Sequence, residues 1–237
     1  MKLLLDCKYA PLTFSWGFIE APIEKIMDVW VPWSKVNFKN VETFVLRESF
    51  PLILKHLEPL TIPRHLELLV ITNSSWVAYF DNGANGGDPE SIIGYLCQVL
   101  RCRGVAVTSI PNTKKGSGRT ATGTYGAVQF ILFAPEEREF LNYERTILAA
   151  NDGGKWVFRA TGTELNFERT EQYRMRKIQD RFTSEMLEEY CLSLGIDLFN
   201  SDFYGPGGFL LKINNPLPPN HPNLSLIEAQ RKLGLIK

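Results

Sequence analysis

The sequence has few of the residues that most often bind metals or form disulfides. It contains three histidines and four cysteines, and no two cysteines stand in CxxC spacing. Zinc sites use such ligands in close sequence pairs, and disulfide frameworks belong to small, cysteine-dense secreted chains. We therefore expect no metal, no disulfide framework and no cofactor, and a reducing compartment.

Long hydrophobic runs and an excess of charge are also absent. The start, MKLLLDCKYAPL, briefly resembles an export signal, but its apolar run stops at Asp6, short of the roughly 7 to 15 residues that a signal needs. Lysine and arginine number 26, as do aspartate and glutamate, so the net charge is zero. These features predict a cytoplasmic protein with no overall attraction to membranes or nucleic acid.

The usual motifs of nucleotide-binding and hydrolytic sites are missing. The glycine-rich loop 111–124 carries Lys114, Lys115 and Arg119, but its lysines precede its glycines, which is not the P-loop order. Gly116-Ser117-Gly118 does not match the GxSxG nucleophile motif. We name no catalytic residue and interpret the loop as a hairpin loop, with binding of nucleic acid or an acidic surface as the alternative.

Apolar segments with the pattern of β-strands dominate the middle of the chain. Turn sequences at 73–75 and at Asn151-Asp152-Gly153-Gly154 predict two hairpins. The predicted strands are 41–46, 66–72, 76–80, 105–110, 125–134, 143–150, 155–162 and 208–213. Strands that follow one another in this way predict mainly antiparallel pairing.

Helical spacing of apolar residues appears before, between and after these strands. The predicted helices are 23–31, ended by Pro32, a short one after Pro51, 88–103, ended by Gly104, 171–180, 184–194, capped by Thr183, and 224–233. We expect a single α+β domain with an antiparallel sheet of about six to seven strands and helices on one face or end. Its parts are a helix-containing segment 1–65, a sheet-rich core 66–213 and a surface tail 214–237.

The stretch DNGANGGDP, residues 81–89, joins a predicted strand to the helix that follows. We interpret Asp81 as a turn residue and Asp88 as the helix N-cap. A cap that occupies the helix N-terminus argues against an anion site there. The additional glycines between the two aspartates predict that another chain segment, or a partner, comes close to this loop.

Aromatic residues in turn-like contexts are the leading candidates for a binding surface. They are Trp30, Trp33, Phe199, Phe203 and Tyr204. Aromatic side chains in loops are favoured anchors in interfaces and pockets.

Arg145 and Arg159 are further binding candidates because they lie in paired strands. On one face they would form a cationic patch suited to carboxylate or phosphate groups. A solvated face with ordinary ion pairs is the alternative that we favour.

Several stretches resemble a group of uncharacterised bacterial proteins. They are WVAYFDNGANGGDP (76–89), LRCRG (100–104), YGAVQF (125–130), NDGGKWVF (151–158) and DRFTSEML (180–187). The resemblance covers residues 65–205 and implies a bacterial, cytoplasmic, single-domain protein. It implies no activity and no residue role.

Together these features predict a non-enzymatic protein of the bacterial cytoplasm that binds another protein, of the immunity type that neutralises its partner. One alternative is a small-molecule-binding protein or hydrolase with a cleft at the sheet edge, lined by the 81–88 turn, Tyr125 and Arg145 or Arg159. An apolar pocket with converging Asp and Arg side chains would favour this alternative, and a flat aromatic surface would favour protein binding. The other alternative is nucleic-acid binding through the 111–124 loop.

Overall fold

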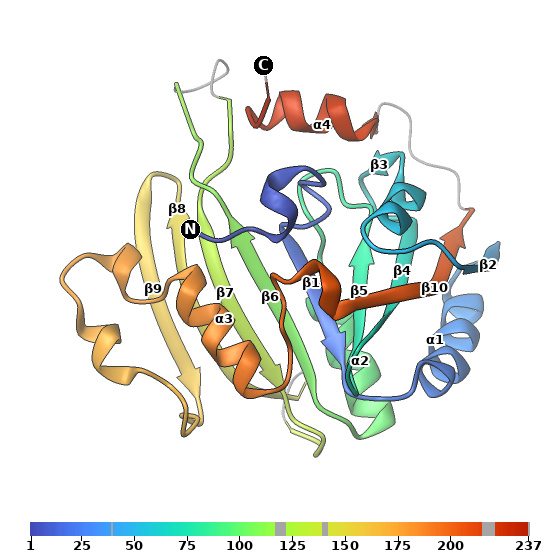
Figure 1. Ribbon diagram of the computed structural model, residues 1–237, viewed down its shortest axis with the longest axis horizontal. Coiled ribbons are helices and arrows are strands. Elements are labelled where there is room, and N and C mark those ends of the chain that lie inside the picture. Colours follow the sequence, from blue (N-terminus) through green and yellow to red (C-terminus); the bar gives the residue numbers. More distant parts are fainter. Residues whose placement is uncertain (39, 117–121, 139–141, 215–220, 237) are drawn as a thin grey trace.

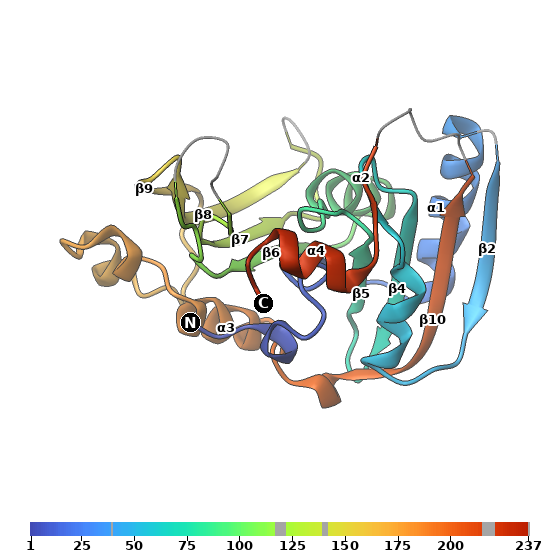
Figure 2. The same ribbon diagram turned by 90° about the horizontal axis from the view of Figure 1, so that it is seen from above.

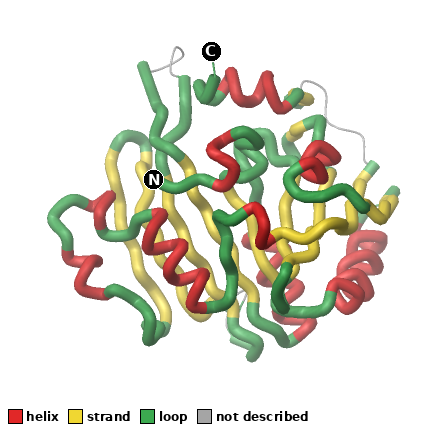
Figure 3. Tube along the Cα trace, viewed as in Figure 1, coloured by secondary structure: helices red, strands yellow, loops and turns green. Residues whose placement is uncertain are grey.

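A large antiparallel sheet forms the centre of the computed structural model, which describes residues 1–237 except 39, 117–121, 139–141, 215–220 and 237 (Figure 1). Its nine strands stand in the order β2-β10-β4-β5-β1-β6-β7-β8-β9, and Figure 3 shows them as one layer flanked by helices. The strands are β1 (Ser15–Ile19), β2 (Val41–Leu46), β4 (Leu66–Thr72), β5 (Val77–Asp81), β6 (Gly104–Ile110), β7 (Ala127–Phe133), β8 (Tyr143–Asp152), β9 (Lys155–Gly162) and β10 (Tyr204–Ile213). Two short strands, β3 (Leu60–Thr61) and β11 (Asn223–Leu224), pair separately.

Helices cover both faces of this sheet. The helices α1 (Ile23–Asn37) and α2 (Glu90–Leu100) pack on one face, and α3 (Ser184–Ser193) packs on the other (Figure 2). The last helix, α4 (Leu226–Lys232), begins with a capping box at Ser225. The other helical segments among the described residues are 3₁₀ turns at Leu4–Cys7, Leu52–Leu57, Thr170–Arg174, Ile178–Asp180 and Ser201–Phe203.

The α+β class and the antiparallel sheet are confirmed, but the predicted strand number and helix placement are wrong. The strand β1, which the sequence did not reveal, lies at the centre of the sheet between β5 and β6. All five of its residues are buried, so it lacks the alternation that marks a half-exposed strand. Each sheet face carries its own core of apolar side chains, and each core needs helices to cover it.

The prediction that Pro32 ends the first helix is wrong, because α1 continues to Asn37. A proline inside a helix removes the hydrogen bond to the carbonyl four residues earlier, which here belongs to the exposed Asp28. Trp30 and Ser34, on either side of Pro32, are both buried. Packing of this stripe therefore keeps the helix intact through the proline.

Both predicted hairpins are confirmed. The strands β4 and β5 pair with Ile71 opposite Val77, and β8 and β9 pair through a turn in which Gly153 and Gly154 have φ values of 62° and 104°. Glycine adopts such values without the steric cost that a Cβ atom adds.

The predicted helix at 171–180 is wrong, since only 3₁₀ turns form there. Neither turn contains a buried residue, so this segment has no apolar face to hold a longer helix against the sheet. Within the described ranges, no helix has the length and apolar character needed to cross a membrane.

Candidate functional site

A cavity of about 560 Å³ lies at the end of the sheet where β5 and β10 finish and β4 begins. Trp33 and Phe38, at the C-terminal end of α1, form part of its apolar wall together with Ile62, Pro63 and Ile213. Its charged lining residues are Arg64, Glu67, Asp81 and Asp88. The cavity thus combines an apolar wall with a dense group of charges.

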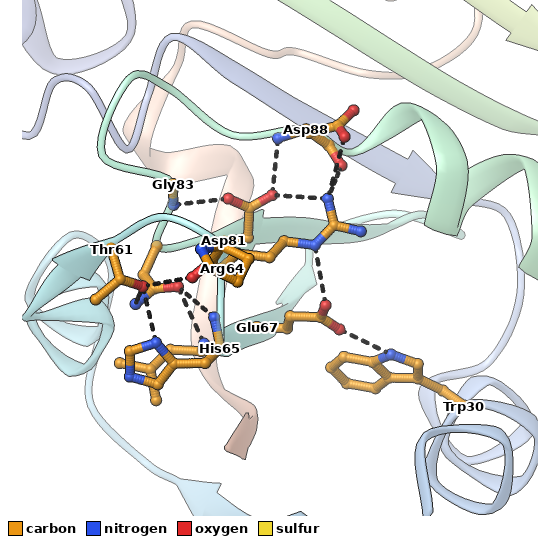
Figure 4. Close-up of polar contacts among 11 residues, drawn as sticks. Trp30, Thr61, Arg64, His65, Glu67, Asp81, Gly83 and Asp88 are labelled. Carbon is orange, nitrogen blue, oxygen red and sulfur yellow. Dashed lines mark hydrogen bonds and ion pairs between the residues drawn. The ribbon is translucent and has the colours of Figure 1, made fainter. Parts of the chain in front are cut away.

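Two of these charges, Glu67 and Asp81, are cross-strand partners on β4 and β5. Both side chains are almost fully buried, at 5% and 1% exposure. Like charges in this arrangement repel one another. The guanidinium of Arg64 lies between them, with Nε donating to Glu67 Oε1 at 3.1 Å and Nη1 at 4.0 Å from Asp81 Oδ2 (Figure 4).

Asp81 fixes the loop that forms one wall of the cavity. Its Oδ1 accepts a hydrogen bond from the backbone N–H of Gly83, and its Oδ2 accepts one from that of Asp88, both at 2.9 Å. Burial raises the pKa of Asp81, although Arg64 and the two N–H donors oppose this shift. The turn role predicted for Asp81 is confirmed, and the side chain spans the whole loop.

The predicted helix cap at Asp88 is wrong. The helix α2 begins after Pro89 with no side-chain cap, and the Asp88 side chain points instead toward Arg64. Nη1 of Arg64 lies 3.4 Å from Asp88 Oδ2 and donates to the Asp88 carbonyl at 2.5 Å. A full positive charge attracts the carboxylate more strongly than the partial charge of a helix end.

Close packing explains the glycines of the loop. A Cβ atom at Gly87 would lie 2.5 Å from the carbonyl oxygen of Ser15 on β1, and one at Gly83 would lie 2.4 Å from that of Gly86. Neither contact is possible for a side-chain carbon. The predicted close approach of another chain segment is therefore confirmed, and the segment is the start of β1.

Glu67 connects the site to α1. Its Oε2 accepts a hydrogen bond from Nε1 of the fully buried Trp30 at 3.1 Å. Burial raises the pKa of Glu67, Arg64 opposes the shift and Asp81 adds to it. Tyr79, on the same side of β5 as Asp81, is fully buried, and its hydroxyl has no hydrogen-bond partner among the residues that the structure describes.

A second polar network holds the segment that carries Arg64. Oδ1 of the buried Asn82 accepts from the backbone N–H groups of His65 and Leu66 at 2.9 and 3.0 Å, and its Nδ2 donates to Thr61 Oγ1 at 3.1 Å. His65 Nδ1 lies 2.8 Å from the same hydroxyl. Burial and the nearby Lys212 lower the pKa of His65, which favours its neutral form.

The aromatic candidates from the sequence divide between the cavity and the cores. Trp33 lies on the cavity wall, and the indole N–H of the buried Trp30 donates a hydrogen bond to Glu67. Phe199, Phe203 and Tyr204 lie against the core on the other face of the sheet. The Tyr204 hydroxyl accepts from Trp16 Nε1 at 3.1 Å and donates to the Leu198 carbonyl at 2.7 Å, so this aromatic group packs the interior and offers no exposed anchor.

The arginine patch does not form, because Arg145 and Arg159 lie on opposite faces. Arg145 pairs with Gly162 and Arg159 with Leu148, which puts them on different sides of the β8–β9 ladder. Arg145 is buried and makes a two-pronged ion pair with Glu168, at 2.8 Å from Nε and 2.6 Å from Nη2. This guanidinium therefore stabilises the fold through Glu168 and is not available to bind a ligand.

The loop candidates lie away from the cavity. Nζ of Lys114 sits 5.2 Å from the ring centre of Tyr125, and Lys115 is exposed. Arg119 lies outside the described residues. Tyr125, expected to line a cleft with the 81–88 turn, is not part of this cavity.

Sequence reasoning missed Arg64 and Glu67. The available signal was Glu67 itself, a charged residue inside the apolar run LELLVIT. Buried acids are rare without a partner, and the nearest arginine in sequence is Arg64. Within the described part of the chain, no group of three or more His, Cys, Asp or Glu side chains is placed to hold a metal ion.

Comparison of the chain with protein-family models, with curated proteins and with solved structures finds no match.

Proposed function

We propose that this protein binds a small organic molecule in the cavity between Trp33 and Arg64 and does not transform it chemically. The observation that carries the proposal is the meeting of the half-buried Arg64 and the buried Glu67 and Asp81 with a largely apolar cavity of about 560 Å³. Ligand sites have volumes of roughly 300 to 1,000 Å³ and combine apolar walls with a few fixed polar groups. Ionisable groups with shifted pKa values cluster at functional sites, and burial shifts the pKa of both Glu67 and Asp81, which favours a role in recognition here.

The state of each carboxylate supports binding over catalysis. Both oxygens of Glu67 and both oxygens of Asp81 already accept hydrogen bonds from the protein. A general acid or base needs an oxygen free to exchange a proton with substrate. The hydroxyl of Thr61 lies 2.8 Å from His65 Nδ1, but Thr61 is fully buried and its hydroxyl also contacts the Pro63 carbonyl at 2.9 Å and Asn82 Nδ2 at 3.1 Å. These contacts hold the hydroxyl within the fold and do not present it to a substrate as a nucleophile.

A fragment screen followed by protein-detected NMR tests this proposal. We expect fragments to shift the amide signals of residues 61–67 and 83–88 and to raise the melting temperature. Ile62→Trp, which places a ring in the cavity, should abolish both effects. Ile227→Trp, at an exposed position on α4, is the matched control. The proposal is wrong if no fragment binds, or if Ile62→Trp binds fragments as well as the wild type does.

Binding of a partner protein is the second candidate function, and the exposed edge strand β2 favours it. β2 pairs with β10 on one side and forms the edge of the sheet on the other. Phe44 and Val45 on this strand are 43% and 67% exposed. An open strand edge with exposed apolar residues can accept a strand from another chain. Complex formation with the product of an adjacent gene, lost in Val45→Lys but retained in Ile227→Lys, would support this candidate.

A further inference from the structure

The charges around the cavity do not balance. One cation, Arg64, faces the three carboxyl groups of Glu67, Asp81 and Asp88, and the neighbouring His65 favours its neutral form. The carboxylates beside Arg64 already neutralise its charge, so they would repel an anionic ligand. A cationic ligand would meet three carboxyl groups and one guanidinium among the charged residues that line the cavity.

Asp88 is the carboxylate best placed to contact a ligand. Its side chain is 69% exposed and touches Arg64 through one contact of 3.4 Å, whereas the two buried carboxylates have donors on both oxygens. The loop fixed by Asp81 holds Asp88 at the cavity rim. An ammonium or guanidinium group could thus bind Asp88 without disturbing the buried cluster.

Another part of the cavity lining is aromatic. Trp33 and Phe38 both line the cavity, with ring centres 6.2 Å apart and planes at 82°. The ring of Tyr95 packs against that of Trp33, with ring centres 5.0 Å apart and planes at 34°. Aromatic faces attract cations and also shelter hydrocarbon groups.

From these observations we infer that the ligand is an organic cation, an ammonium or guanidinium on an apolar body, whose charged head binds Asp88 and whose body lies against Trp33 and Phe38. The inference rests on the proposed function and specifies the ligand class of the same cavity.

Three matched probes test the charge of the ligand by calorimetry: 2-phenylethylamine, 2-phenylethanol and 3-phenylpropionate. They share the ring and differ in the charge of the head group. We expect the amine to bind about tenfold more tightly than the alcohol, because an exposed ion pair and a cation–π contact together supply about this factor. The inference is overturned if the alcohol or the carboxylate binds as tightly as the amine, or if none of the three binds.

Variants locate the head group. Asp88→Asn should weaken binding of the amine about fivefold and strengthen that of 3-phenylpropionate, because Arg64 Nη1 loses a competing carboxylate. Asp28→Asn, which removes the same charge from the exposed side of α1, should change neither affinity. Trp33→Leu, which keeps an apolar wall without an aromatic face, should weaken the amine and leave the alcohol nearly unchanged. Equal effects of Asp88→Asn and Asp28→Asn would overturn the inference.

The same cation could be a free molecule or a basic side chain of a polypeptide. N-acetyl-phenylalanyl-lysinamide, with the norleucine analogue as its neutral control, distinguishes the two sources. If this dipeptide binds more tightly than 2-phenylethylamine does, the inference that the ligand carries a cation stands, and the proposal that the ligand is a small molecule is overturned. Conversely, if fragments bind in the cavity but no cationic probe does, the proposed function stands and the inference of a cationic ligand is overturned.

Discussion

Glu67 and Asp81 lie directly opposite each other on neighbouring strands and share one cation, the guanidinium of Arg64. Both carboxyl groups are almost fully buried. In such surroundings two carboxylates repel strongly unless a positive charge lies between them. Folding of β4 against β5 is therefore coupled to the position of Arg64 at the cavity.

Arg64→Met should destabilise the protein by about 3 to 5 kcal/mol at neutral pH, because it leaves buried carboxylates without their cation. Urea unfolding followed by circular dichroism measures this loss. Arg159→Met, at an exposed position on β9, is the matched control and should stay within about 0.5 kcal/mol of the wild type.

The double variant Arg64→Met/Glu67→Gln measures the interaction free energy between Arg64 and Glu67. Since Glu67→Gln removes one of the two facing charges, the double variant should be more stable than Arg64→Met alone. Additive losses in this cycle would show that the two side chains do not interact across the site.

The pH dependence of stability should change in Glu67→Gln. Burial raises the pKa of Glu67 above its ordinary value of 4.5, so the folded state holds this proton more tightly than the unfolded state does. Stability contributed by the protonated group is present at low pH and is lost as pH rises from about 4.5 through the folded-state pKa. The stability of the wild type relative to Glu67→Gln should therefore fall across this range.

Urea unfolding at pH values from 4 to 8 measures the difference between the two proteins. Glu24→Gln, at an exposed position in the first turn of α1, is the control, and its stability should depend on pH in the same way as that of the wild type. A difference between wild type and Glu67→Gln that is constant with pH would contradict the raised pKa.

Local sequence signals predicted those elements that depend on local chemistry. The glycines at 153 and 154, the cap at Thr183 and the apolar stripe of α2 each act within a few residues, and the elements they specify formed as expected. The strand β1 was not predicted, because burial on both faces removes the alternation of apolar and polar residues that marks a strand. The order of the strands depends on long-range pairing, which no local pattern records.

The candidate site was predicted in part for the same reason. The loop 81–88 and Trp33 were recognised from their own composition. Arg64 and Glu67 acquire their importance from Asp81, which lies opposite Glu67 only after β4 and β5 have paired. The faces of Arg145 and Arg159 depended on hairpin register, since a shift of one residue exchanges the two sides of a strand.

Arg145→Met should destabilise the fold without affecting the cavity. Arg145 and Glu168 form a buried two-pronged ion pair, and Tyr173 donates a further hydrogen bond to Glu168 at 2.8 Å. Removing one partner of such a pair costs about 3 to 5 kcal/mol. The affinity for any cavity ligand, measured by calorimetry on the folded variant at low temperature, should equal that of the wild type.

The exposed Arg159 again supplies the control, since Arg159→Met removes the same charge from the other face of the same hairpin. A marked loss of ligand affinity in Arg145→Met would assign this residue to the binding site and contradict its structural role.

Gly87→Ala should loosen the wall of the cavity. The new methyl group would lie 2.5 Å from the Ser15 carbonyl and 3.3 Å from Asp81 Oδ2, and relief of this contact should cost about 1 to 3 kcal/mol. Because the loop must move away from β1, the Gly83 and Asp88 N–H groups that bind Asp81 should exchange faster with solvent. Gly195→Ala is the comparison: its φ of 80° also disfavours alanine, but nothing lies within 4 Å of the added carbon. It should lower global stability while leaving the relative protection of the two loop amides unchanged, and a Gly87→Ala protein with wild-type amide exchange would show that the glycine is not required for packing.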